Sequence, residues 1–239
     1  MNEVVTKLTR RQMSEGTVNS MLEGPDPVSA RNDAKREYAG AAAPLLAELE
    51  AAGFHIETIG DLYRSKMNYH TAIPILLRWL PRIEDRFVKD DIIRALTVKW
   101  AKPVAASTLI DLFRQEDDPS GTGSKWVIAN ALSVVSDETV LDTIIELVTD
   151  SRHGAARQML ALALSNMKQP KAIDTLIELL SDDVVAGHAI IALGKLQAMK
   201  ARTFIEPFLN HPKAWVRQEA RRTLKSLNTQ DISSEQRGA

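Results

Sequence analysis

The 239-residue chain contains no cysteine and few aromatic residues. Without cysteine it can form no disulfide, no thiolate nucleophile and no thiolate zinc site. Phe, Trp and Tyr together make up 5% of the residues, and strands are the elements that favour these side chains. The scarcity of aromatic residues therefore favours helices packed on helices over β-sheets.

The chain also lacks a strong charge of either sign and a long apolar run. Its formal net charge is -1, so no overall field draws it to nucleic acid or to an anionic membrane. No apolar run approaches the roughly 18 residues of a membrane span, and residues 1–12 are too polar for a signal peptide. We therefore expect a cytoplasmic protein with no membrane partner.

Motifs that would carry chemistry are missing as well. The five histidines, at positions 55, 70, 153, 188 and 211, do not occur in HExxH or another metal-ligand spacing. Gly121 to Lys125 lack the spacing of a Walker phosphate loop and instead favour a flexible turn capped by Ser124. We therefore predict no catalytic, metal-binding or cofactor-binding residue, and a protein that is not an enzyme.

Polar segments lie at both ends of the sequence. Residues 1–36 are polar and contain the run Gly24-Pro25-Asp26-Pro27, which predicts a partly disordered N-terminal arm with one short helix near Val4–Met13. Residues 228–239 are polar too, with Gly238 near the end, and are expected to form a disordered C-terminal tail.

Between these ends the sequence repeats itself. Residues 142–150, DTIIELVTD, return as residues 174–182, DTLIELLSD, at a shift of 32. Further matches downstream follow at shifts of 29 and 31 residues. A period near 30 with apolar residues at helical spacing indicates a helix-turn-helix unit, stacked so that each copy buries the apolar face of its neighbour.

The repeats predict one solenoid domain over residues 37–227. Apolar residues at helical spacing begin at Ala41 and end at Leu227. A leading helix is expected over residues 41–52, closed by Gly53 in a C-capping position. About five helix pairs follow it.

Two segments resemble a known family. Residues 211–227, HPKAWVRQEARRTLKSL, resemble the second helix of a short HEAT repeat. Residues 183–196 end in Ala-Leu-Gly-Lys-Leu, which resembles the ending of the HEAT-like subtype first recognised in phycobilin lyases (PBS lyase repeats). The resemblance covers residues 124–227 well and residues 69–115 weakly. It implies an all-α, right-handed α-α superhelix of the armadillo type, with a concave groove that binds a partner.

The aligned repeats separate core positions from charged positions. Two apolar columns on the second helices are expected to form the core: Ile128, Leu160, Ala189 and Ala220, and Leu132, Leu164, Leu193 and Leu224. A basic column of Lys125, Arg157 and Arg217, interrupted by Ala186, is expected to contact acidic residues in the turns, such as Asp150 and Asp182.

The other side of the second helices resembles the lining of the groove. We predict that it binds the partner through Trp126, Asn130, Leu162, Asn166, His188, Ile191, Lys195 and Arg222. Trp126, Leu162 and Ile191 are apolar where a solvated face would be polar, and exposed apolar surface indicates contact. The alternative is that helix rotation packs these three side chains against the adjacent repeat, and the sequence leaves both interpretations open.

Three functions are compatible with this surface. The first is a non-catalytic scaffold or adaptor that binds another protein or a peptide in the groove. The second is a nucleic-acid-binding protein, similar to the HEAT-like DNA glycosylases, that uses the basic residues of segment 195–225, where eight basic side chains accompany two acidic ones. That segment also suits the polar end cap of a solenoid. The third, a lyase-type accessory subunit, is suggested by the repeat subtype alone.

Overall fold

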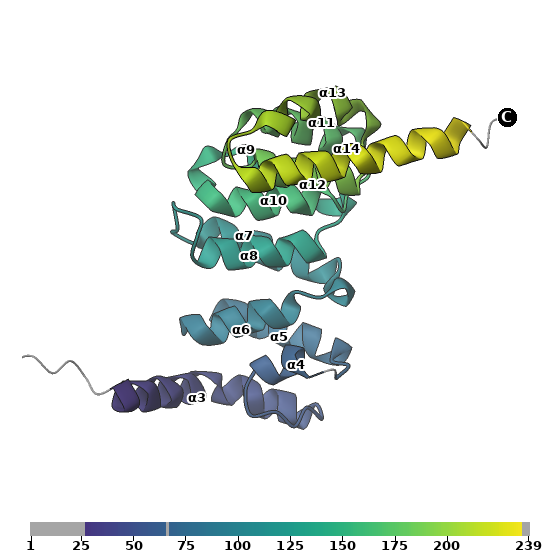
Figure 1. The fold of residues 1–239 in the computed structure, drawn as a ribbon. Helices are drawn as coiled ribbons and strands as arrows, with labels where there is room; N and C mark the ends of the chain where they lie inside the picture. Colours follow the sequence, from purple (N-terminus) through teal and green to yellow (C-terminus); the bar gives the residue numbers. More distant parts are fainter. Residues whose placement is uncertain (1–26, 66, 236–239) are drawn as a thin grey trace, which may run out of the picture.

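The computed structural model describes residues 27–65 and 67–235, and its regular structure over these ranges is entirely helical (Figure 1). A leading helix, α3 (Pro27–Ala51), and a short helix, α4 (Gly60–Arg64), precede five helix pairs. The pairs are α5 (Ile73–Trp79) with α6 (Arg86–Leu96), α7 (Val104–Gln115) with α8 (Ser124–Val135), α9 (Leu141–Thr149) with α10 (Arg157–Leu164), α11 (Pro170–Glu178) with α12 (Ala186–Lys195), and α13 (Arg202–Ile205) with α14 (Ala214–Glu235). The predicted all-α solenoid is confirmed.

Short 3-10 helices extend or join these α-helices. They are η1 (His70–Ala72), η2 (Leu80–Arg82), η3 (Lys99–Ala101), η4 (Glu138–Val140), η5 (Ser151–Ala156), η6 (Leu179–Ser181), η7 (Met199–Ala201) and η8 (Glu206–Asn210). Several of them lead directly into the first helix of a pair or out of it, so α5, α11 and α13 are shorter in α-helical form than their apolar patterns suggest.

The second helices of the pairs stack on one another. Helix α10 packs against α8 on one side and α12 on the other, α12 packs against α14, and α8 packs against α6. In Figure 1 these helices lie in one layer at the front of the molecule, and α7, α9, α11 and α13 lie behind them. The structure is therefore a row of helix pairs in which each second helix contacts the next.

The predicted core columns lie at the contacts between helices. Seven of the eight side chains are buried, and Ile128, Leu160, Ala189 and Ala220 have no exposed surface. The exception is Leu224, which is only partly buried. It belongs to α14 and lines a hollow shared with Arg202 and Leu209, so part of its side chain stays exposed.

The turn before α8 is built differently from the prediction. The carboxylate of Asp118 accepts hydrogen bonds from the amides of Gly121 (3.0 Å), Gly123 (2.8 Å) and Lys125 (3.3 Å). The Ser124 hydroxyl donates instead to Glu116 (2.7 Å). The prediction that Ser124 caps this helix is wrong, because Asp118 satisfies the free amides at its start.

Two glycine turns interlock between the second and third pairs. Gly121 (φ +63°) and Gly154 (φ +52°) both adopt the left-handed conformation. A Cβ atom on Gly121 would lie 2.2 Å from the carbonyl oxygen of His153, and one on Gly154 would lie 2.3 Å from that of Ser120. The amide of Ala155 donates to the same Ser120 oxygen (2.9 Å). Backbone therefore meets backbone here, and neither position has room for a side chain.

Both ends of the described chain are more helical than the sequence predicts. Helix α3 begins at Pro27, so residues 27–36 of the predicted arm are helical. Gly53 follows α3 with φ of +91°, which confirms its capping role. Helix α14 runs to Glu235, past the predicted end of the solenoid at Leu227. The expected helix near Val4–Met13 lies outside the described residues.

No described helix combines the length and the apolar character needed to cross a membrane.

We expect Gly121→Ala to lower the free energy of unfolding by about 3 kcal/mol, because the new Cβ would clash with the His153 carbonyl and strain the backbone. Urea unfolding followed by circular dichroism measures the change. The control is Gly40→Ala in α3, where a Cβ meets no atom within 4 Å. It should leave stability unchanged or raise it by up to about 1 kcal/mol. A Gly121→Ala variant as stable as the wild type would contradict the interlocked turns.

Candidate functional site

The repeat register arranges the outward side chains of α8, α10, α12 and α14 in columns, which we call the second-helix face. Shifts of 32, 29 and 31 residues carry each column from one helix to the next. The central column is Asn130, Leu162, Ile191 and Arg222. The columns on either side are Trp126, Gln158, Gly187 and Gln218, and Val134, Asn166, Lys195 and Ser226. Seven of the eight predicted groove residues fall in these columns.

The three large apolar residues of this face differ in burial. Trp126 keeps 38% of its surface exposed. Leu162 is partly buried and packs against the core. Ile191 is partly buried and lines a cavity between α12 and α14. Each side chain is therefore partly packed against the repeats and partly exposed, and partner binding at this surface stays a prediction.

Two of the predicted groove residues make contacts within the fold. The side-chain amide of Asn166 donates to the carbonyl oxygen of Ser133 (2.8 Å) and so joins the ends of α10 and α8. The ring of His188 lies edge-on to that of Trp215, with centroids 5.5 Å apart. Burial lowers the pKa of His188, and its Nδ1 is buried without a hydrogen-bond partner in the described structure. Both side chains hold neighbouring helices together.

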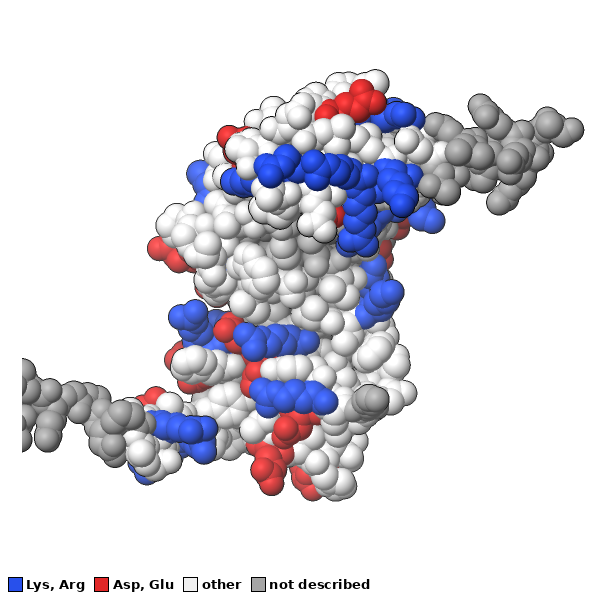
Figure 2. Space-filling model, in the orientation of Figure 1, with Lys and Arg blue, Asp and Glu red and all other residues white. Residues whose placement is uncertain are grey.

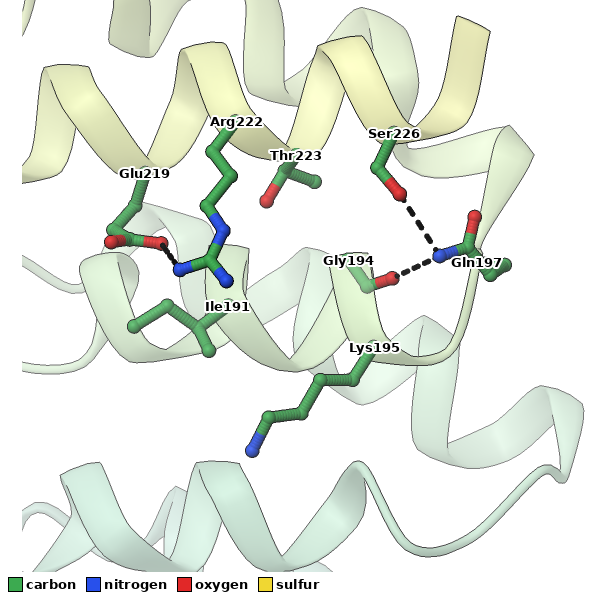
Figure 3. Close-up of a pocket in the computed structure, with 8 residues that line it drawn as sticks. All are labelled: Ile191, Gly194, Lys195, Gln197, Glu219, Arg222, Thr223 and Ser226. Atoms are coloured by element: carbon green, nitrogen blue, oxygen red, sulfur yellow. Dashed lines mark hydrogen bonds and ion pairs between the residues drawn. The ribbon is translucent and has the colours of Figure 1, made fainter. Parts of the chain in front are cut away.

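A basic cavity of about 280 Å³ lies between α12 and α14 at one end of the face (Figure 3). Its lining includes Ile191, Lys195, Gln197, Glu219, Arg222 and Ser226. Nη1 of Arg222 is 4.0 Å from Oε2 of Glu219, at the limit of an ion pair. Lys195 forms no ion pair with any described residue. Two cations and one anion therefore face the cavity.

Hydrogen bonds fix the inner wall of the basic cavity. Nε2 of Gln197 donates to the carbonyl oxygen of Gly194 (2.9 Å) and to the hydroxyl of Ser226 (3.1 Å). The other amide atom, Oε1 of Gln197, is buried and has no partner among the described residues. The wall thus joins the end of α12 to α14 and leaves one polar atom unsatisfied.

An aromatic cavity of about 450 Å³ lies near the other end of the face. Its lining includes Tyr63, Met67, Tyr69, Arg94, Trp100 and Asn130. The Trp100 ring packs against the rings of His70 (centroids 4.8 Å apart) and Tyr69 (5.7 Å), and 44% of the residue remains exposed. Asn130 is the one predicted groove residue in this lining. Sequence reasoning missed the others, because they lie in turns and in α4 and α6, outside the clear repeats.

The carboxylate of Asp91, next to the aromatic cavity, accepts hydrogen bonds from two tyrosines. Oδ2 of Asp91 accepts from the Tyr38 hydroxyl (2.8 Å) and Oδ1 from the Tyr63 hydroxyl (2.6 Å). Burial, followed by the contact with Asp91, raises the pKa of both phenols. Both tyrosines therefore stay protonated and join α3 and α4 to α6. All three tyrosines of the chain lie before residue 70. This clustering was the one feature of the sequence that could have pointed to the cluster around Asp91.

The predicted basic column makes three different kinds of contact. Arg157, which is buried, donates to the carbonyl oxygen of Val148 (2.7 Å) and to Asp182 (2.6 Å), which confirms the expected contact. Burial alone would raise the pKa of Asp182, but hydrogen bonds from the Val184 amide and Arg157 lower it.

The other two members of the column do not reach a carboxylate, so the prediction is wrong for them. Nζ of Lys125 lies 3.3 Å from Nδ1 of His153 and 5.5 Å from the centroid of the Phe113 ring. Burial and the Lys125 charge lower the pKa of His153. Arg217 donates to the carbonyl oxygens of His211 and Pro212. Lys125 thus contacts the turn before α10 of the next pair, whereas Arg217 contacts the turn before its own helix, α14.

The described residues offer no group of three or more His, Asp or Glu side chains arranged to hold a metal ion.

Arg157→Ala is expected to lower the free energy of unfolding by about 2 to 3 kcal/mol, because it leaves Asp182 and the Val148 carbonyl without their partner. Folding lowers the pKa of Asp182 below its unfolded value of 3.8. The ion pair therefore stabilises the fold fully above pH 3.8, and this stabilisation is lost as the pH falls below that value. Urea unfolding at neutral and acidic pH measures both effects.

The matched control is Arg152→Ala, whose side chain is 86% exposed and pairs with Asp150 in its own turn. We expect its unfolding midpoint to match that of the wild type. Equal effects of the two substitutions would contradict the structural role of Arg157.

We expect the wild type to lose stability between about pH 7.5 and about pH 5, because the folded-state pKa of His188 lies below its unfolded value of 6.5. The neutral imidazole is favoured in the fold above that value, and the gain disappears as the pH falls. His188→Leu should therefore make the loss smaller. His55→Leu, at an exposed histidine, should show the wild-type loss. Identical pH profiles for all three proteins would contradict this role of His188.

One part of the chain matches a known protein family. Residues 123–185 match a family model described as HEAT repeats. The match spans α8 to α11, about a quarter of the chain, and includes two of the four helices of the second-helix face, α8 and α10. No curated protein matches the sequence. The match does not distinguish the phycobilin-lyase subtype, which stays a prediction. The central repeats of this chain are similar to HEAT repeats.

Proposed function

We propose that this chain is a non-catalytic scaffold or adaptor that binds another protein or a peptide through its second-helix face. The proposal rests on the apolar surface that Trp126, Leu162 and Ile191 present along neighbouring helices of a solenoid. Stacked repeats provide extended surfaces of this kind for partners. Exposed tryptophan surface is also characteristic of residues that dominate binding energy.

The distribution of charge also supports the second-helix face as the surface that binds the partner. In Figure 2, Lys and Arg side chains gather along α14 and near α6, while the surface over α8 and α10 is largely free of charged groups. The middle of the face is therefore uncharged, with apolar surface at Trp126 and Leu162, and its ends are charged. An apolar centre with a polar rim is typical of protein interfaces, and charged ends orient a partner as it approaches.

Nucleic-acid binding is a second candidate, supported by the basic residues of α14. Arg221, Arg222 and Lys225 are exposed on that helix. The middle of the face offers a phosphate backbone few cations, and regularly placed cations supply most of the affinity for nucleic acids. A DNA-binding titration that stays flat as salt rises would eliminate this candidate. No observation favours a lyase-type accessory subunit. We place the proposed adaptor in the cytoplasm, as the sequence predicts.

The test of the scaffold is a nuclease-treated pull-down from cells of the native organism, comparing the wild type with Leu162→Asp/Ile191→Asp. We expect stoichiometric protein partners with the wild type and a loss of at least tenfold with the variant, because two buried charges would oppose an apolar contact. Partners are read by mass spectrometry, and circular dichroism verifies that the variant is folded.

Two further variants keep this experiment decisive. Trp126→Ala changes only a partly exposed side chain and should weaken capture without affecting the fold. Phe204→Asp alters an exposed residue on α13 (52% exposed) and should retain every partner. Partners that bind all four proteins equally would refute the proposed binding face.

A further inference from the structure

The central column of the second-helix face connects the two cavities. Its first member, Asn130, lines the aromatic cavity, and its last two members, Ile191 and Arg222, line the basic cavity. Leu162 lies between them in the same register. A ligand that follows this column would therefore meet an aromatic cavity, an apolar centre and a basic cavity in turn.

The basic cavity has the chemistry to hold a single carboxylate. Arg222 is 81% exposed on its side chain and only at the limit of an ion pair with Glu219, so its guanidinium remains open to a second acceptor. Lys195 also lines this cavity, although in Figure 3 its side chain runs along the side of α12 that faces away from α14. The Ser226 hydroxyl already accepts a hydrogen bond from Gln197, which leaves its own hydrogen to donate. Arg forms paired hydrogen bonds with a carboxylate.

The aromatic cavity has room for one large apolar side chain. Trp100, Tyr69 and Met67 contribute its apolar surface, and Trp100 remains 44% exposed. Arg94 and Asn130 supply polar groups in the same lining, which can pair with the backbone of a bound chain. Aromatic side chains of a partner that enter such pockets commonly carry much of the binding energy.

The helix spacing sets the distance between the two cavities. The aromatic cavity lies at α6 and α8 and the basic cavity at α12 and α14, so three helix-to-helix steps separate them. At about 8 to 10 Å per step the separation is about 24 to 30 Å. An extended chain advances about 3.3 Å per residue, so about seven to nine residues span this distance.

We propose that the second-helix face binds an extended acidic peptide segment. One large apolar residue of the segment occupies the aromatic cavity, and an Asp or Glu about seven to nine residues away occupies the basic cavity. Small or apolar residues between them lie over Leu162. This inference rests on the proposed scaffold function and specifies the chemistry of its partner.

A peptide suits this face better than a nucleic acid does. The cations of the basic cavity, Lys195 and Arg222, lie at one end of the central column, and the column itself holds Asn130, Leu162 and Ile191 before Arg222. A polyanionic backbone would place phosphates over these uncharged side chains without a partner.

The experiment selects displayed random peptides of sixteen residues against the full-length chain and measures the selected peptides, labelled with fluorescein, by fluorescence anisotropy. We expect a consensus with one large apolar residue and one Asp or Glu at the predicted spacing. Arg222→Glu should weaken binding at least tenfold, and a peptide whose acidic residue is changed to Lys should recover affinity for that variant.

Matched control variants show whether binding depends on the two cavities or only on the overall charge of the surface. Arg221→Glu reverses the adjacent residue, which is exposed and lines a different hollow facing α13, and should bind like the wild type. Trp100→Ala should weaken binding at least tenfold, and Phe204→Ala should not.

The outcomes distinguish this inference from the proposed function. Peptides that lose affinity with Leu162→Asp but not with Arg222→Glu would overturn the acidic segment and leave the scaffold intact. Equal losses with Arg221→Glu and Arg222→Glu, a consensus spacing of fewer than five residues, or no selected peptide would overturn it too. If Leu162→Asp also leaves peptide binding unchanged, both proposals fail.

Discussion

The burial of one apolar column between successive second helices is the constraint on which the structure depends. Ile128, Leu160, Ala189 and Ala220 have no exposed surface, and each lies where one second helix meets the next. A single helix pair cannot bury such a column alone, so each repeat is stable only with its neighbours. The same register fixes which side chains point away from the contacts, so the position of the second-helix face follows from the core.

The repeat period made most of this fold predictable from the sequence. The helix pairs, the core columns and the capping role of Gly53 all follow from apolar spacing and glycine conformation. Leu224 differs because it lines a hollow beside α13, and periodicity alone does not predict how closely two helices fill the space between them. Asp118 displaced Ser124 as the helix cap because its longer-range hydrogen bonds depend on how the whole turn folds.

The candidate site was less predictable, because its cavities combine residues from different elements. The register placed Ile191, Lys195 and Arg222 correctly on one surface, and the structure brings them together at the basic cavity. Trp100 and Arg94 belong to a region without clear repeats, so no column linked them to Asn130. The contacts of His188 and Asn166 depend on side-chain orientation, which periodicity alone does not determine.

Site-specific photo-crosslinking in cells tests the central claim most directly. A photoreactive amino acid replaces Trp126 on the second-helix face in one protein and Phe204 on α13 in another, two exposed positions of the same fold. The account predicts discrete protein adducts from position 126 and none from position 204. Adducts from position 204 alone, or the same adducts from both positions, would contradict a partner bound on the second-helix face.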